Sequence, residues 1–208
     1  MLDKSIENSE SEVKEALPDY CRKYTVEDYQ SWDEGFRSEL YEGTLIVSEA
    51  PTPRHQEILM EIVVRLHIFL KGKPCKVYPS PFAVRLNQNE ETVFEPDIVV
   101  ICDKTKFVRN IYCGPPDLVV EILSPSTAHK DKKLKFQKYL KAGVPEYWII
   151  DPYRNTLEAN RLTGNELNGN EQADNKYTTT IYNKTNTAPI LVKTLKGFKI
   201  NLADIFAE

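Results

Sequence analysis

The chain has 208 residues, of which 41% are hydrophobic, and carries a formal net charge of −4. This favours one globular domain with a sizeable core, and it excludes a surface that is basic all over, so that any nucleic-acid binding must use a local patch. No apolar run approaches the roughly 18 residues of a membrane helix, and four cysteines without C-x-x-C spacing exclude a zinc ribbon and favour reduced thiols in the cytoplasm.

Residues 1–23 are predicted to be a polar N-terminal arm and residues 24–208 a single domain. The start of the chain is acidic and has no apolar signal region, so it does not resemble a secretory signal. A short helix is predicted from Thr25 to Ser31, capped by Thr25. Two short strands are predicted between Phe36 and Val47, around the turn signal Glu42-Gly43.

A long amphipathic helix is predicted from Arg54 to Leu70, where large apolar residues repeat at helical spacing. The sequence Lys-Gly-Lys-Pro then ends it. Two strands are predicted next, from Cys75 to Leu86 and from Thr92 to Ile101, followed by a connecting loop from Cys102 to Pro116. The second strand carries Glu95-Pro96-Asp97 directly before a run of β-branched residues.

The apolar run from Leu118 to Leu123 is the centre of the predicted fold. It is rich in β-branched residues and apolar on both faces, which is typical of a strand buried on both sides. A single carboxylate, Glu121, interrupts it. Because burying an unpaired carboxylate is costly, we expect Glu121 to be protonated, paired with a cation or bound to a metal.

A lysine-rich helix is predicted after this strand, with Ser126 or Thr127 as its N-cap and Gly143 at its C-terminal end. Lys135 falls at the edge of the apolar stripe, where its ammonium group can point to a neighbouring acidic site, and Asp131 lies one turn before it. The lysines of this helix have two interpretations: a solvated face, or a patch that contacts phosphates and makes DNA binding salt-dependent.

Further strands complete the predicted sheet. They span residues 145–151, 156–162, 176–182, 189–192 and 197–200, and a final helical turn spans 202–206. The order of the elements predicts an α/β or α+β fold, in which a central mixed β-sheet has a helix on each face and extra strands at the C-terminus.

Two acidic residues mark a candidate catalytic site. Asp97 begins one predicted core strand and Glu121 lies near the end of the next, so pairing of these strands would let both carboxylates converge on one divalent ion. Mg²⁺ prefers carboxylate oxygens and retains waters. It would stabilise charge on a phosphoryl oxygen and lower the pKa of the attacking water. With Lys135 orienting that water, the three side chains predict a phosphodiesterase.

Three motifs give the chain a resemblance to a known family. The segments Glu95–Val100 (EPDIVV), Pro116–Thr127 (PDLVVEILSPST) and Gly143–Pro152 (GVPEYWIIDP) resemble, in the same order, the Uma-type restriction endonucleases that are abundant in cyanobacteria. This family belongs to the PD-(D/E)XK nuclease superfamily. The resemblance extends from Tyr24 to Phe206.

The resemblance implies a restriction-endonuclease-like core and Mg²⁺-dependent cleavage of DNA, with Mn²⁺ as a substitute metal. By position, it makes Asp97 and Glu121 the catalytic, metal-binding acids. The superfamily has a lysine two residues after the glutamate, where this chain has Leu123, and the resemblance assigns the role of that lysine to Lys135. It also makes Glu39 a further metal ligand.

Four basic side chains are predicted to contact nucleic acid. They are His55, at the start of the long helix, and Lys132, Lys133 and Lys138, which also compete with Lys135 for the catalytic role. DNA is therefore the expected partner. A homodimer is expected as well, because cutting both strands of a duplex favours two-fold symmetry.

Two other functions stay open from the sequence. The absence of a lysine at Leu123 and the acidic net charge also fit a catalytically inactive nuclease fold that only binds a nucleic acid or a protein. A metal-dependent hydrolase of RNA or of a nucleotide would use the same three side chains. No base-reading motif such as a zinc finger is present, so the sequence does not predict a recognition site.

Overall fold

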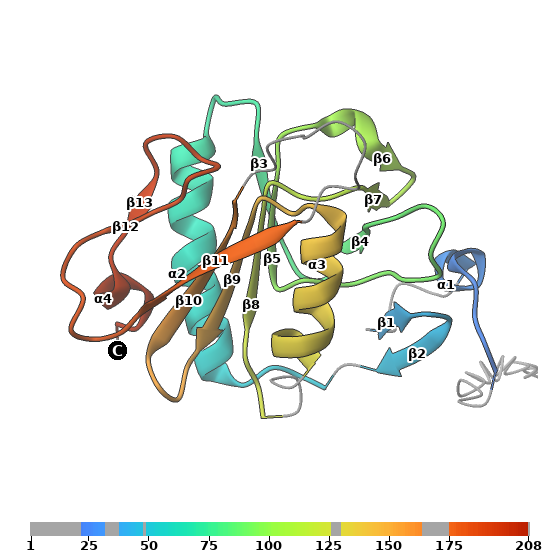
Figure 1. The fold of residues 1–208 in the computed structure, drawn as a ribbon, viewed down its shortest axis with the longest axis horizontal. Coiled ribbons are helices and arrows are strands. Elements are labelled where there is room, and N and C mark those ends of the chain that lie inside the picture. Colours follow the sequence, from blue (N-terminus) through green and yellow to red (C-terminus); the bar gives the residue numbers. More distant parts are fainter. Residues whose placement is uncertain (1–21, 32–37, 48, 126–129, 164–174, 208) are drawn as a thin grey trace, which may run out of the picture.

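A six-stranded mixed sheet forms the centre of the molecule (Figure 1). The structure, a computed structural model, describes residues 22–31, 38–47, 49–125, 130–163 and 175–207. From one edge to the other, the sheet consists of β11 (Lys176–Tyr182), β10 (Thr156–Thr163), β9 (Glu146–Asp151), β8 (Leu118–Ile122), β5 (Ile98–Ile101) and β3 (Lys76–Pro79). β8 and β9 are parallel and all other neighbours in this sheet are antiparallel, which confirms the predicted mixed sheet.

A helix covers each face of the sheet, α2 (Pro53–Leu70) on one side and α3 (Phe136–Ala142) on the other (Figure 1). Alternate residues of the strands point to opposite faces, so Val120 packs in the core under α2 and Val119 in the core under α3. All of β8 is buried, which confirms the strand predicted to be covered on both sides. None of the helices in the described part of the chain combines the length and hydropathy that a membrane crossing requires.

Local signals mark the start of α2 and the end of α3. The side chain of Thr52 caps α2 by accepting a hydrogen bond from the backbone N–H of His55, and Pro53 stands in the first turn. Gly143 ends α3 in the left-handed conformation, with φ at 77°. Directly before α3 the chain forms a π-helix, Lys130–Lys135, where we expected a regular α-helix. The predicted N-cap positions of this helix lie outside the described residues.

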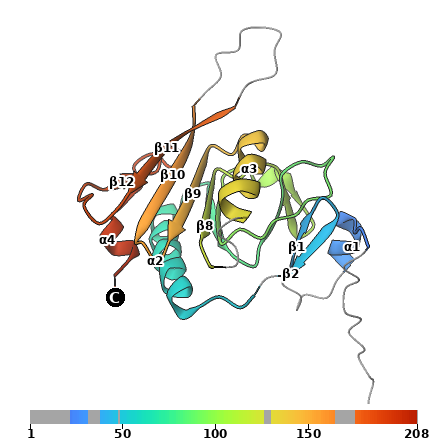
Figure 2. The same ribbon diagram turned by 60° about the horizontal axis from the view of Figure 1, so that its bottom comes forward.

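Short elements surround the sheet (Figure 2). They are α1 (Val26–Ser31), β1 (Ser38–Tyr41), β2 (Thr44–Val47), β4 (Ala83–Arg85), the 3₁₀ turn Lys104–Lys106, β6 (Phe107–Val108), β7 (Ile111–Cys113), β12 (Ile190–Leu191), β13 (Lys199–Ile200) and α4 (Leu202–Ile205). The predicted hairpin of β1 and β2 is confirmed. The cap of α1 is confirmed too, because Thr25 and Asp28 exchange backbone-to-side-chain hydrogen bonds.

Three predicted segments differ in the structure. The segment from Cys75 to Leu86 forms two short strands in different sheets, β3 and β4, because its prolines lack the N–H that a continuous ladder needs. The segment from Thr92 to Ile101 is a regular strand only in its last four residues. The predicted loop from Cys102 to Pro116 contains the short strands β6 and β7, which pair with each other, and β7 also pairs with β4.

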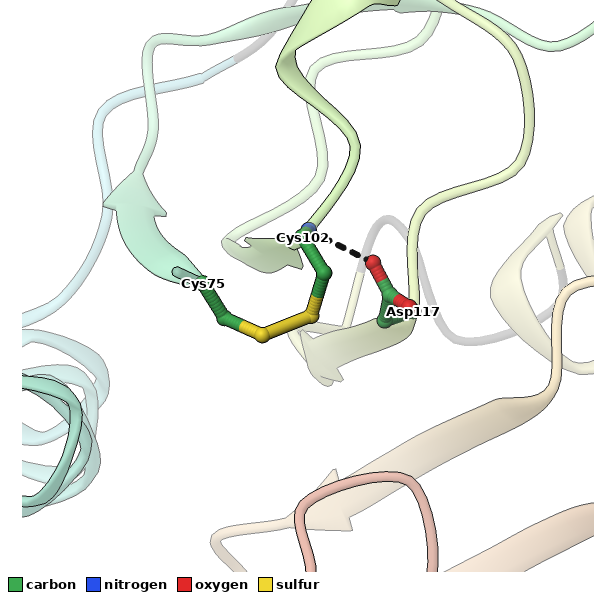
Figure 3. Close-up of a disulfide and its surroundings, with 3 residues drawn as sticks. All are labelled: Cys75, Cys102 and Asp117. Carbon is green, nitrogen blue, oxygen red and sulfur yellow. Dashed lines mark hydrogen bonds between the residues drawn. A yellow bond between two sulfur atoms is a disulfide. The ribbon is translucent and has the colours of Figure 1, made fainter. Parts of the chain in front are cut away.

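A disulfide joins Cys75, directly before β3, to Cys102, directly after β5 (Figure 3). Lys76 lies opposite Ile101 in this antiparallel pair, so the two cysteines are the next facing positions. The backbone N–H of Cys102 donates to Oδ2 of Asp117 at 2.7 Å, on the side away from Cys75 (Figure 3). The structure thus corrects the expectation of reduced thiols for this pair. The cytoplasmic location, where disulfides are rare, is still a prediction.

Reducing this disulfide is expected to lower the free energy of unfolding by about 3 kcal/mol, because the bond closes a long loop in the unfolded chain, with a sequence separation of 27. Thermal unfolding with and without dithiothreitol measures the loss. The Cys75→Ser, Cys102→Ser double variant should unfold like the reduced wild type and ignore the reductant. The control Cys113→Ser removes a free thiol and should still respond. A wild type whose melting temperature does not change contradicts the pairing.

Candidate active site

A cavity of about 590 Å³ opens at the end of the sheet where β5 begins and β8 ends. Six carboxylates line it beside one lysine and one histidine; the eight side chains are Glu39, Glu49, Glu95, Asp97, Glu121, Asp131, Lys135 and His55. They come from the β1–β2 region, the start of α2, the segment before β5, the end of β8 and the π-helix. The cavity thus unites all the predicted catalytic and metal-binding residues with His55.

The pairing of β5 with β8 brings Asp97 and Glu121 to this cavity. Ile98 lies opposite Val120 in the antiparallel pair, so Asp97 and Glu121, one position further, continue the register and lie on the same face. Oδ2 of Asp97 also accepts a hydrogen bond from the backbone N–H of Ile122 at 2.7 Å. The side chain of Asp97 is therefore tied directly to the end of the strand that carries Glu121.

Lys135 lies among three carboxylates. Its Nζ is 2.8 Å from Oε1 of Glu121, 2.8 Å from Oε1 of Glu39 and 3.5 Å from Oδ1 of Asp131. The hydroxyl of Tyr139 donates to the same Oε1 of Glu121 at 3.0 Å. All five side chains are buried. One ammonium group thus balances part of the negative charge of three buried acids that line the cavity.

Burial and charge shift the pKa values of this cluster. Burial favours the neutral amine of Lys135, but the carboxylates of Glu121, Glu39 and Asp131 outweigh it and raise the pKa of Lys135 well above the usual value. Burial raises the pKa of Glu121 well above the usual value, although Lys135 opposes the change. A lysine with a raised folded-state pKa stabilises the fold at every pH below its unfolded pKa, and this contribution is lost as the pH rises through the folded pKa. The three carboxylates therefore favour the charged ammonium form of Lys135.

His55 contacts Asp97. Its Nε2 is 3.2 Å from Oδ2 of Asp97, and the imidazole is buried. The cap at Thr52 fixes the first turn of α2, which places His55 beside the acid. The structure thus gives His55 a role in orienting Asp97, and its contact with a DNA phosphate is still a prediction.

Three further side chains belong to the cluster, and none of them is among the site residues predicted from the sequence. Glu95 and Asp131 line the cavity, and Tyr139 holds Glu121. The signals are local: Glu95 precedes Asp97 by two residues, and Asp131 and Tyr139 lie four residues before and after Lys135, a spacing that brings helical side chains together.

The remaining predicted lysines lie outside the cavity lining. Lys132 and Lys133 are exposed on the π-helix. Nζ of Lys138 is 2.6 Å from Oε2 of Glu90 and 3.1 Å from Oε1 of Glu42, so this lysine is bound to acids near the β1–β2 turn. Phosphate contact by these three lysines is still a prediction, and Lys138 would have to exchange its carboxylates for phosphate.

The donor set of the cavity fits a hard cation. In the described ranges of the chain, no group of three or more His, Cys, Asp or Glu side chains is arranged to hold a metal ion by itself. Mg²⁺, however, is usually bound through one or two carboxylates and keeps several waters. Asp97 and Glu121 meet that requirement in a cavity where carboxylates outnumber cations. Glu39 shares the ammonium group of Lys135 with Glu121, and its binding of a metal is still a prediction.

Comparison with known sequences gives a family and two relatives. The Uma2 family, described as "Putative restriction endonuclease", matches residues 26–203. The uncharacterized proteins slr1290 and sll1609 of Synechocystis sp. are 29% and 27% identical over 119 and 120 residues, or 56% of this chain in each case. The matches cover 62% of slr1290 and 67% of sll1609, so the chain spans less than two thirds of the first of these relatives.

A solved structure shares the fold. It is the crystal structure of a "putative nuclease belonging to DUF820" from Anabaena variabilis, which matches with a TM-score of 0.69 and 21% identity. The match covers 88% of this chain and 97% of that one. The architecture predicted from the sequence, a restriction-endonuclease-like core with a central mixed sheet, is therefore confirmed.

Proposed function

Because the chain belongs to the Uma2 family of restriction endonuclease-like proteins, we propose that it is a Mg²⁺-dependent endonuclease that hydrolyses the phosphodiester bonds of DNA. One observation carries the proposal: Asp97, Glu121 and Lys135 come from three separate elements and line one acidic cavity. Two carboxylates that bind a cation and a lysine that stabilises negative charge are suited to phosphodiester hydrolysis. Mn²⁺ is expected to replace Mg²⁺.

The two catalytic acids have separate supports. Asp97 and Glu121 would hold the metal, which would supply stabilisation of charge on a phosphoryl oxygen and a lowered pKa of bound water. The backbone N–H of Ile122 and the imidazole of His55 orient Asp97. The hydroxyl of Tyr139 orients Glu121. Both acids are therefore positioned before substrate binds, which lowers the reorganisation needed during the reaction.

Lys135 has the role of a fixed positive charge. Its raised pKa keeps the ammonium group protonated at neutral pH, so it can donate hydrogen bonds to the attacking water or to the phosphoryl oxygens. Glu39 and Asp131 hold the amine beside Glu121. This arrangement explains how a chain with Leu123 in place of the usual lysine can carry the same charge into the site from the next helix.

Cleavage of supercoiled plasmid DNA tests the proposal. The wild type should nick the plasmid in Mg²⁺ or Mn²⁺ and lose this activity in EDTA, and Asp97→Asn should nick it about 100-fold more slowly or not at all. Asp103→Asn changes an exposed acid just beyond β5 and should keep the wild-type rate. Equal rates for the wild type and Asp97→Asn contradict this mechanism. A parallel assay on labelled RNA separates DNA from RNA as the substrate.

One observation favours a second function, a nuclease fold that binds nucleic acid without cutting it. Lys135 contacts three carboxylates, and the superfamily's usual lysine position is filled by the buried side chain of Leu123. A binding module of this kind should shift DNA in a gel equally well with Mg²⁺ and with EDTA, and should show no nicking under either condition.

A further inference from the structure

The solvent face of α2 is apolar at its centre. Met60, Val64 and Ile68 are exposed by 52%, 43% and 67%, and their four-residue spacing aligns them along one side of the helix. The opposite side of α2, including Ile62 and Leu66, is buried in the core. A helix that is apolar on both sides is normally covered on both sides.

Charges of opposite sign end this stripe. Glu57, whose side chain is 61% exposed and whose Oε2 is 3.2 Å from Nη1 of Arg54, lies near the start of α2. The exposed Lys71 follows the last residue of the helix. Both are seven residues from Val64, and Met60 and Ile68 are both four residues from it. Going from Val64 toward either end of the helix, the stripe therefore has an apolar residue and then a charged one. The charge is negative at one end and positive at the other.

We propose that this α2 stripe, defined by Glu57, Met60, Val64, Ile68 and Lys71, is the surface through which two copies of the chain associate. The two helices lie antiparallel about a two-fold axis beside Val64. In such an isologous interface each contact occurs twice. Met60 then meets Ile68 of the partner subunit, and Glu57 meets Lys71 of the partner subunit. A parallel arrangement would instead place equal charges together, so charge complementarity selects the antiparallel one.

The surface beside Met60 also suits a second copy. A shallow hollow lies there, lined by the first two turns of α2 and by Ala207. In the antiparallel arrangement this end of the helix receives the partner's Ile68, the most exposed apolar side chain of the stripe. Glu61, at the rim of the hollow, lies at the position that faces the partner's His67. An apolar centre with a charged rim is the usual anatomy of a protein interface.

Another exposed surface offers a rival interface, the edge strand β11. It ends one side of the sheet, and Ile181 on it is 60% exposed. Its other exposed residues are mostly threonines, and it shows no charges placed symmetrically about a centre. Edge strands also pair through backbone groups, so a substitution at Ile181 provides a matched control for one on α2.

Sedimentation velocity over a range of protein concentrations tests the dimer, whose mass is twice the 24.0 kDa of the chain. Val64→Glu places two like charges beside the two-fold axis and should raise the dissociation constant of the dimer at least about tenfold. Ile181→Glu should leave it unchanged. Because both positions are exposed, circular dichroism should show both variants folded. A wild type that is monomeric at every concentration overturns the proposal, as does a dimer lost in Ile181→Glu and kept in Val64→Glu.

Charge reversal tests the antiparallel geometry. Glu57→Lys and Lys71→Glu should each weaken the dimer, because each places like charges at both ends of the interface. The double variant should restore the dimer, since every Glu then faces a Lys again. A double variant that dimerises no better than either single one overturns the arrangement. These experiments measure the mass of the protein and not DNA cleavage, so their outcome tests the dimer independently of the proposed nuclease activity.

Discussion

Lys135→Met is expected to abolish DNA cleavage and to lower the free energy of unfolding by about 3–5 kcal/mol. Cleavage is lost because the variant has no ammonium group in the cavity to stabilise negative charge. Stability is lost because Glu39, Glu121 and Asp131 are buried and lose the cation that they share. Plasmid nicking measures the first effect, and urea unfolding at neutral pH measures the second.

The loss of stability should depend on pH. The pKa of Glu121 is already raised by burial and rises further when Lys135 no longer opposes the shift. A carboxylate with a raised folded-state pKa destabilises the fold above that pKa and not below its unfolded pKa, which is 4.5 for an ordinary glutamate. The free energy of unfolding of Lys135→Met should therefore be closer to that of the wild type at about pH 5 than at about pH 8.

Two further variants test whether the effect depends on the position of the lysine and whether a positive charge alone is enough. Lys133→Met removes an exposed lysine from the same π-helix and should change the free energy of unfolding by less than about 0.5 kcal/mol. Lys135→Arg keeps the positive charge but replaces a compact ammonium with a planar group, so it should remain folded and cut DNA poorly. A Lys135→Met protein that is as stable as the wild type and cuts DNA at the same rate would refute both the buried cluster and its catalytic role.

Glu146→Ala is expected to lower the free energy of unfolding by about 3–5 kcal/mol without removing any group from the cavity. Glu146 is completely buried in β9, and its Oε1 accepts hydrogen bonds from Trp148 Nε1 at 2.9 Å and Arg161 Nε at 3.1 Å. Its Oε2 accepts from the backbone N–H of Lys193 at 2.8 Å. The alanine variant leaves Arg161 as a buried charge without its carboxylate and removes the acceptor of the backbone N–H of Lys193.

Thermal unfolding should show this loss as a melting temperature lower by roughly 10 °C, because a chain of this size loses about 2–4 °C for each kcal/mol. Hydrogen exchange should increase most in the segment around β12, which Glu146 holds through Lys193. Glu27→Ala changes an exposed acid and should have little effect. An alanine variant at 146 that melts with the wild type would show that the hydrogen-bonded cluster contributes little to stability.

The elements that the sequence predicted well are those set by local patterns. Three of these predictions are confirmed: the apolar period of α2, its end near Leu70, and the glycine at 143 that ends α3 in the left-handed conformation. Each depends only on residues that are neighbours in the chain. The long strand predicted between Cys75 and Leu86 is wrong because two prolines divide it between sheets, and the pattern of apolar residues does not reveal which partner each half finds.

The approach of Asp97 to Glu121 could be predicted because it needs only two strands to pair. Each acid lies at the end of a run of buried β-branched residues, and antiparallel pairing of those runs brings the two ends together. The surroundings of Lys135 could not be predicted in the same way. A regular helix places this lysine at the edge of the apolar stripe, whereas the π-helix that precedes α3 changes the number of residues per turn and so the direction of the side chain.

Local patterns in the chain predict the class of fold, the placement of Asp97 and Glu121 on neighbouring strands and the lysine-rich helix that follows, because hydrophobic period, turn residues and motif order are properties of short segments. The burial of Lys135 among three carboxylates, the hydrogen bond from Tyr139 to Glu121 and the pairing of Cys75 with Cys102 are visible in the folded chain alone. These contacts join residues from separate elements. Their geometry follows from strand register and helix rotation, which are set by the packing of the whole core and not by any one segment.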